Sequence, residues 1–65
     1  MNNERVQRLA VSKLQLEGEQ VLYNQVLEIE NGKVIRYYPL LAELAYTEWH
    51  PWTVVLFRDG SWQRL

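Results

Sequence analysis

The sequence predicts a mainly β protein of about five strands, in a small sandwich or a partly open barrel built from two β-hairpins. Two observations carry this prediction. β-rich runs flank Asn31-Gly32, and a second pair of β-rich runs flanks Asp59-Gly60. Asn-Gly and Asp-Gly are favoured two-residue turns between antiparallel strands. With 48% hydrophobic and 23% charged side chains, the 65 residues suit a single small β domain over residues 1–65.

The first predicted hairpin joins residues 21–30 to residues 33–38. A two-residue turn sets the register of a hairpin. The expected facing pairs are Glu30 with Lys33, Ile29 with Val34, Leu27 with Arg36, and Val26 with Tyr37. Because alternate side chains share a face, Ile35 and Tyr37 are expected on the face of Val26, opposite to Leu27. Both faces are then partly apolar, which favours a sandwich or barrel over a sheet with one exposed side.

The second predicted hairpin joins residues 53–58 to residues 61–65 through the Asp59-Gly60 turn. Its expected facing pairs are Phe57 with Trp62, Leu56 with Gln63, and Val55 with Arg64. The first of these is an aromatic cross-strand pair, which stabilises a sheet by about 0.2–1 kcal/mol relative to two alanines.

Two segments allow more than one interpretation. Val6, Leu9, Ala10 and Leu14 recur at helical spacing, but Leu14 and Leu16 alternate with polar residues as in a strand. We favour a strand over residues 6–16, followed by a turn at residues 17–20. Residues 40–45 after Pro39 suit either a short helical turn, with Pro39 at its first position, or an irregular loop.

Composition excludes several classes of protein. The chain has no cysteine and one histidine, which excludes a disulfide framework, a thiolate zinc site and a histidine-rich metal site. We expect no cofactor and no bound metal. The net charge of -1 argues against a nucleic-acid partner, whose phosphates attract cations. The first residues lack the pattern of a signal peptide, and no apolar run is long enough to span a membrane. We therefore expect a cytoplasmic protein with no membrane partner.

One stretch of sequence has a family resemblance. Residues 24–35 read Asn-Gln-Val-Leu-Glu-Ile-Glu-Asn-Gly-Lys-Val-Ile. They resemble the amino-terminal β-sandwich (composite) region of amidohydrolase-type metal-dependent hydrolases, where such a hairpin lies beside the catalytic barrel. Residues 52–56 stand where that family has the strand leading to its first metal-binding histidines. The resemblance covers roughly residues 9 to 57.

The departures from that family limit what the resemblance implies. Residues 57–60 read Phe-Arg-Asp-Gly where the family continues into a His-x-His motif, and the 65 residues hold no catalytic barrel. No catalytic residue is carried over to this chain. The resemblance implies a β-sandwich-like scaffold without hydrolase activity. The chain also looks similar to small uncharacterised Bacteroides-type proteins, which implies no known activity.

No residue set predicts catalysis. His50 lies near Glu48, as a general base or metal ligand could, but no nucleophile or second ligand accompanies it. We interpret His50 as a loop residue between two anchoring tryptophans. Glu28 and Glu30 are spaced like paired carboxylates, but their position beside a turn indicates solvated charges at a strand end.

Aromatic and arginine side chains form the one predicted binding surface, since Trp, Tyr and Arg are enriched at interaction hot spots. Its candidate residues are Arg36, Tyr37, Tyr38, Trp49, Trp52 and Trp62. The tryptophans suit either an exposed patch or the plugged ends of a small barrel. Arg36, Tyr37, Tyr38, Trp62 and Arg64 also suit a stacking platform for single-stranded nucleic acid, although nearby glutamates dilute its positive charge.

These observations favour a non-enzymatic β scaffold or protein-interaction module that self-associates or binds a protein partner. Free strand edges beside a small aromatic core are ready to pair with another chain. One alternative function is an accessory β-subunit of a separately encoded hydrolase. Another is a binder of small ligands or single-stranded nucleic acid through the aromatic face.

Overall fold

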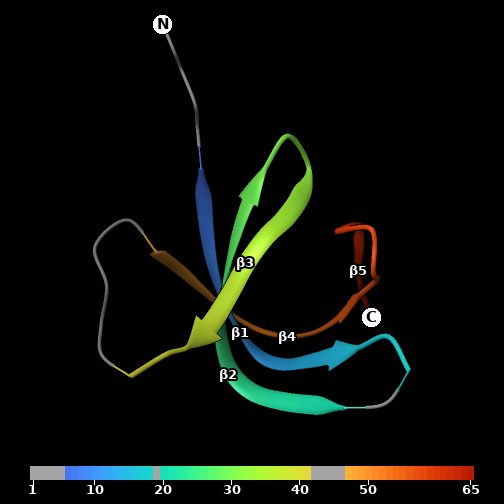
Figure 1. The fold of residues 1–65 in the computed structure, drawn as a ribbon. Helices are drawn as coiled ribbons and strands as arrows, with labels where there is room; N and C mark the ends of the chain where they lie inside the picture. Colours follow the sequence, from blue (N-terminus) through green and yellow to red (C-terminus); the bar gives the residue numbers. More distant parts are fainter. Residues whose placement is uncertain (1–5, 19, 42–46) are drawn as a thin grey trace, which may run out of the picture.

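The computed structural model describes residues 6–18, 20–41 and 47–65, and these form five strands of one sheet. In chain order the strands are β1 (Gln7–Leu16), β2 (Val21–Glu30), β3 (Lys33–Pro39), β4 (Thr47–Leu56) and β5 (Trp62–Arg64). Their order across the sheet is β3-β2-β1-β4-β5 (Figure 1). β1 and β4 run parallel, and the other neighbouring strands run antiparallel. The prediction of a mainly β fold with about five strands is confirmed.

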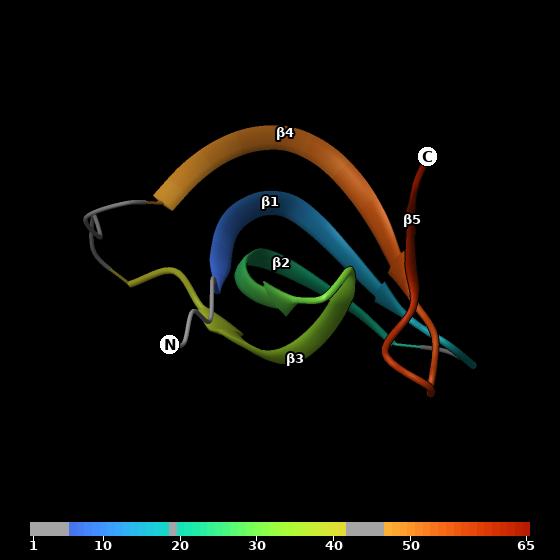
Figure 2. The ribbon, with the colours of Figure 1, turned by 90° about the horizontal axis from the view of Figure 1, so that it is seen from above.

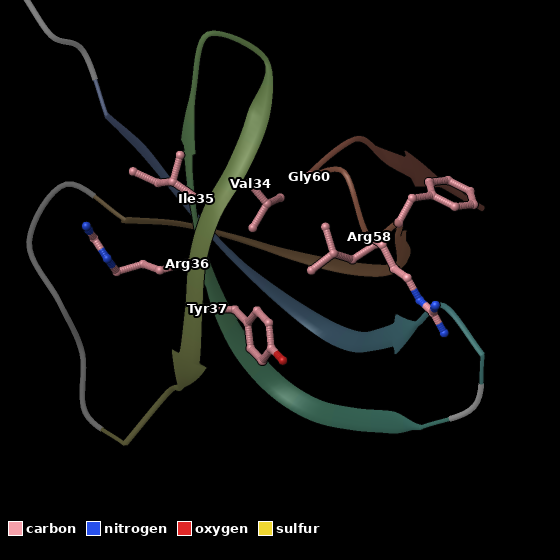
Figure 3. A pocket seen from close by; sticks show the side chains of 8 residues that line it. Val34, Ile35, Arg36, Tyr37, Arg58 and Gly60 are labelled. Atoms are coloured by element: carbon pink, nitrogen blue, oxygen red, sulfur yellow. The ribbon is translucent and has the colours of Figure 1, made fainter.

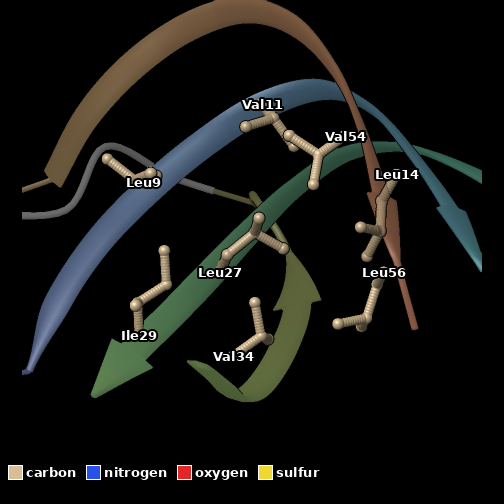
Figure 4. Packing of buried hydrophobic residues seen from close by; sticks show 8 residues of the cluster. All are labelled: Leu9, Val11, Leu14, Leu27, Ile29, Val34, Val54 and Leu56. Carbon is tan, nitrogen blue, oxygen red and sulfur yellow. The ribbon is translucent and has the colours of Figure 1, made fainter. Parts of the chain in front are cut away.

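The sheet is strongly curved and forms an open half-barrel rather than a two-layered sandwich (Figure 2). Side chains inside the curve make the hydrophobic core (Figure 4). The core cluster consists of Leu9, Val11, Leu14, Leu27, Ile29, Val34, Val54 and Leu56. Trp52 and Trp62 are partly buried against this cluster. A single curved sheet can therefore enclose an apolar interior without a second layer.

Residues 7–16 form a strand, as predicted, because this segment lies in the middle of the sheet. β1 has β2 on one side and β4 on the other, so both sides of its backbone have ladder partners. Leu9, Val11 and Leu14 all belong to the core cluster. The interval between successive core residues of β1 therefore changes from two residues to three. The pairing with β4 shifts between Val11 and Lys13, at this same place. The helix-like spacing in the sequence thus reflects an irregular strand.

The first hairpin has the predicted turn but only part of the predicted register. Asn31 and Gly32 have φ values of 54° and 79°, as a type I′ turn requires. Glu30 faces Lys33 and Ile29 faces Val34, as expected. Beyond these pairs, a β-bulge adds Ile35 to β3, so each later residue of β3 faces a different partner.

The bulge makes two predicted pairs wrong. Leu27 faces Tyr37 rather than Arg36, and Val26 faces Tyr38 rather than Tyr37. Facing residues share a side of the sheet, so Tyr37 lies on the side of Leu27 instead of that of Val26. The extra residue in β3 is the physical reason, because alternation along a strand reverses at such an insertion.

The second hairpin forms, but its predicted turn and register are wrong. The N–H of Phe57 donates to the carbonyl oxygen of Ser61 at 2.8 Å, and that of Gly60 donates to Phe57 at 3.0 Å. Residues 58–60 therefore make a three-residue loop, in which Gly60 alone has a positive φ, of 93°. The observed pairs are Leu56 with Trp62, Val55 with Gln63, and Val54 with Arg64.

The carboxylate of Asp59 favours this longer loop. It accepts hydrogen bonds from the N–H and the hydroxyl of Ser61, at 2.9 and 2.6 Å. These two bonds lower the pKa of Asp59 below its ordinary value. A side chain that bonds to the backbone two residues later stabilises a turn, and here the loop is one residue longer than predicted because it also includes Arg58.

The beginning of the segment after β3 does not fit the first of its two interpretations, a short helical turn with Pro39 at its first position. Pro39 belongs to β3, and the N–H of Leu40 donates to the carbonyl oxygen of Asn24 at 2.8 Å. Leu40 therefore continues the pairing of β3 with β2, and Pro39 is not the first residue of a helix. The rest of the segment with these two interpretations, a helical turn or an irregular loop, is residues 42–45 and lies outside the described residues.

One backbone hydrogen bond links β3 to the loop between β4 and β5. The N–H of Val34 in β3 donates to the carbonyl oxygen of Gly60 at 2.8 Å. A Cβ atom at Gly60 would lie 3.3 Å from the carbonyl oxygen of Val34, whereas a Cβ atom at Gly32 would have nothing within 4 Å. Gly60 thus allows the β4–β5 loop to approach the backbone of β3.

Replacing Gly60 with alanine should destabilise the protein more than replacing Gly32. Both glycines have positive φ, so each substitution costs about 1–2 kcal/mol of strain, but only the new methyl group at position 60 also crowds Val34. We expect Gly60→Ala to lower the free energy of unfolding by about 1 kcal/mol more than Gly32→Ala. Urea denaturation measures both values, and equal losses would contradict the role assigned to the Val34–Gly60 contact.

Candidate functional site

Glu28 is the most constrained ionisable group among the described residues. It lies in the middle of β2 and is only 5% exposed. The prediction that Glu28 is a solvated charge at a strand end is therefore wrong. The error follows from the sheet order, because β2 has a strand on each side and side chains from both of these strands bond to Glu28.

Three side chains from neighbouring strands bond to the Glu28 carboxylate. The guanidinium of Arg8 donates to its Oε2 atom at 3.1 Å, and the hydroxyl of Tyr38 donates to the same atom at 2.6 Å. The guanidinium of Arg36 donates to the Oε1 atom. Arg8 and Arg36 both face Glu28 in the ladder, so β1, β2 and β3 are joined through one carboxylate. We call these four residues the Glu28 cluster.

Hydrogen bonding determines the charge state of this cluster. The Tyr38 hydroxyl has the largest effect and, with Arg8 and Arg36, lowers the pKa of Glu28 to about 2, although burial opposes the change. The same bond to Glu28 raises the pKa of Tyr38. Glu28 is therefore anionic at neutral pH, and both of its oxygens accept hydrogen bonds. Such a carboxylate is a poor general base and has no proton to donate, so the cluster is better suited to holding strands together than to catalysis.

Replacing Glu28 with glutamine should destabilise the fold, because the amide removes the charge that pairs with two guanidinium groups. We expect Glu28→Gln to lower the free energy of unfolding by about 2–3 kcal/mol. Glu30→Gln is the matched control, since Glu30 lies on the same strand beside the turn, and its effect should stay within about 0.5 kcal/mol. Thermal and urea unfolding measure both variants. Equal effects would mean that the bonds of the buried Glu28 carboxylate add no stability.

Stability should also depend on pH through Glu28. The folded protein lowers the pKa of this carboxyl from 4.5 to about 2, so folding favours the anion. Its stabilising contribution is complete above pH 4.5 and is lost as the pH falls toward 2. The difference in unfolding free energy between the native chain and Glu28→Gln should shrink across that window. A difference that stays constant between pH 5 and pH 2 would contradict the charge state assigned to Glu28.

His50 lies within β4 rather than in the loop predicted from the sequence. Its ring stacks on Trp52, with the ring centroids 3.9 Å apart and the planes 13° apart. The Nε2 atom of His50 is 3.2 Å from the Oε1 atom of Glu48. The guanidinium of Arg64 lies over the Trp52 ring at 4.7 Å. Within the described ranges, no group of three or more acidic or histidine side chains is arranged to hold a metal ion.

The structure distributes the six predicted interaction residues over different parts of the sheet. Trp52 and Trp62 pack against the core, and Arg36 and Tyr38 bond to Glu28. Tyr37 and Trp49 are 40% and 54% exposed, on β3 and β4. Trp49 faces Ala10, Ala10 faces Val26, and Val26 faces Tyr38. Facing residues share a side of the sheet, so Trp49 lies on the same side as the Glu28 cluster. The tryptophans are thus divided between core and surface.

A shallow groove lies between β3 and the β4–β5 loop, at the open side of the half-barrel (Figure 3). Its volume is about 140 Å³, and an adjoining hollow of about 270 Å³ shares several of its residues. The groove is lined by Val34, Ile35, Arg36, Tyr37, Leu56, Phe57, Arg58 and Gly60. Figure 3 shows the Arg36 side chain directed away from Arg58. Sequence reasoning missed Phe57 and Arg58 as surface residues, because only the curvature of the sheet brings them near Tyr37.

Comparison of the chain with protein-family models, with curated protein sequences and with solved structures gives no match. The resemblance of residues 9 to 57 to the β-region of amidohydrolases therefore stays a prediction. In the part of the chain that the structure describes, no helix is long and apolar enough to cross a membrane.

Proposed function

We propose that the chain is a non-enzymatic β scaffold whose function is to associate with other protein chains, and first of all with copies of itself. The observation that carries this proposal is the open half-barrel. The sheet does not close, and within the described residues the outer edge of β5 has no neighbouring strand. An unpaired strand edge is a template for a strand of another chain.

The use of the polar side chains supports a binding function over a catalytic one. The carboxylate of Glu28 accepts bonds from Arg8, Arg36 and Tyr38. Among the described residues, every buried side-chain nitrogen and oxygen has a hydrogen-bond partner. The buried polar groups are thus engaged in the fold itself, whereas a catalytic site keeps reactive groups available for a substrate.

Exposed apolar side chains also support association. Tyr37 and Phe57 line the groove on the open side, and they are 40% and 37% exposed. Trp49 is more than half exposed on the opposite face of the sheet. Aromatic side chains provide large contact areas at protein interfaces. In a chain of 65 residues, such surface is available to a partner without loss of the core.

Light scattering after size-exclusion chromatography tests the proposal. We expect the average mass to rise above the 7.8 kDa of the monomer as the protein concentration is increased a hundredfold. Association through a small surface is governed by mass action, so the rise should reverse on dilution. A mass of one chain at every concentration would contradict self-association.

A further inference from the structure

The backbone of β5 presents hydrogen-bonding groups on its outer edge. The N–H of Phe57 donates to Ser61 and that of Leu65 donates to Thr53, so Ser61 and Leu65 direct backbone groups toward β4. Hydrogen-bonded and non-hydrogen-bonded pairs alternate along an antiparallel ladder. Trp62 and Arg64 therefore direct their N–H and C=O groups away from the sheet. In the described part of the chain, no strand pairs with this edge.

The opposite edge of the sheet, β3, is protected against strand pairing. The N–H of Val34 already donates to Gly60. Ile35 forms a bulge, and Pro39 has no N–H to donate. Bulges and prolines are features that prevent edge strands from pairing with other chains. β5 has neither a bulge nor a proline, so it accepts a further strand more readily than β3 does.

We propose that a second copy of the chain adds its own β5 to this edge, antiparallel, with the two-fold axis at Gln63. This interface rests on the proposed function of self-association and specifies where it occurs. In this register Trp62 faces Arg64 of the second copy, and both have outward-facing backbone groups. Each such pair exchanges two N–H···O bonds, as in any hydrogen-bonded antiparallel pair. The two sheets become one continuous sheet.

The side chains of β5 are complementary to themselves in this register. Gln63 is exposed and faces Gln63 of the second copy, and a carboxamide both donates and accepts hydrogen bonds. The guanidinium of Arg64 already lies 4.7 Å from the ring of Trp52. Facing residues share a side of the sheet, so Trp62 of the second copy lies beside the same guanidinium. Arg64 is then placed between two indole rings, an arrangement that favours cation–π contacts.

The interface is small, because β5 has three residues. Stable protein interfaces bury roughly 1,200–2,000 Å², and a three-residue edge buries less. We therefore expect a reversible dimer with a dissociation constant of about 10–1000 μM.

Two substitutions at one position separate the backbone contribution from that of the side chain. Arg64→Pro removes the guanidinium and the outward N–H, whereas Arg64→Ala removes the guanidinium alone. Neither removes a bond of the internal ladder. We expect Arg64→Ala to dimerise about tenfold more weakly than the native chain and Arg64→Pro to stay monomeric, in light scattering at up to about 1 mM protein. Near-ultraviolet circular dichroism checks that both variants keep the native fold.

Amide hydrogen exchange on the native chain gives an independent measurement. Dimerisation through β5 should slow exchange at Trp62 and Arg64 as concentration rises, whereas the amide of Gln63, already in the ladder, should change little. Association of Arg64→Pro as strong as that of the native chain would overturn this interface and leave self-association standing. If the native chain dimerises but amide exchange at Trp62 does not change with concentration, this interface is also overturned and self-association still stands. A native chain that is monomeric throughout would overturn both.

Discussion

The carboxylate of Glu28 is the point on which the arrangement of β1, β2 and β3 depends. Placing a charge in a buried position is costly unless other charges and donors compensate for it. Arg8, Arg36 and Tyr38 supply that compensation from the two neighbouring strands. Each of these bonds requires one register of the strands. A shift of either neighbour by one residue would leave the carboxylate buried without its partners.

The bulge at Ile35 makes this arrangement compatible with the apolar core. Before the bulge, Val34 faces Ile29 and belongs to the core cluster. After it, Arg36 faces Glu28 on the other side of the sheet. Without the extra residue, the register of the turn would place Arg36 opposite Leu27. One inserted residue therefore serves both the interior of the half-barrel and the Glu28 cluster on its outer face.

The curvature of the sheet explains how a short chain without cysteine builds a core from a single layer. Eight apolar side chains line the inside of the curve, and Trp52 and Trp62 partly cover them. The Val34–Gly60 hydrogen bond holds β3 near the β4–β5 loop. The two edges of the sheet differ, because β3 has a bulge, a proline and the bond of Val34 to Gly60, whereas β5 has none of these. The proposed association through β5 follows from this inequality.

Local patterns in the sequence indicated all five strands and the place of both hairpins, although β4 begins at Thr47 rather than at residue 53 and the second turn is one residue longer than predicted. Asn31-Gly32 specified its turn and the first two pairs of its hairpin, because positive φ at two adjacent residues is a local property of these residue types. The wrong registers are shifts of one residue, from the Ile35 bulge and from the three-residue loop that Asp59 and Ser61 stabilise. The errors about the burial of Glu28 and the place of His50 within β4 are of another kind, because both depend on neighbouring strands.

The Glu28 cluster and the groove were decided by the tertiary structure alone. Neither could be read from the sequence, because the bonds to Glu28 and the approach of Phe57 to Tyr37 require strands that are distant along the chain. The pairing of β1 with β4 begins at Arg8 and Thr47. It joins the segment that precedes the first hairpin in the sequence to the segment that follows it. Such pairing depends on how the whole sheet curves to bury its apolar face. Residue type and spacing specify that a strand forms, whereas packing decides which neighbour it meets and in which register.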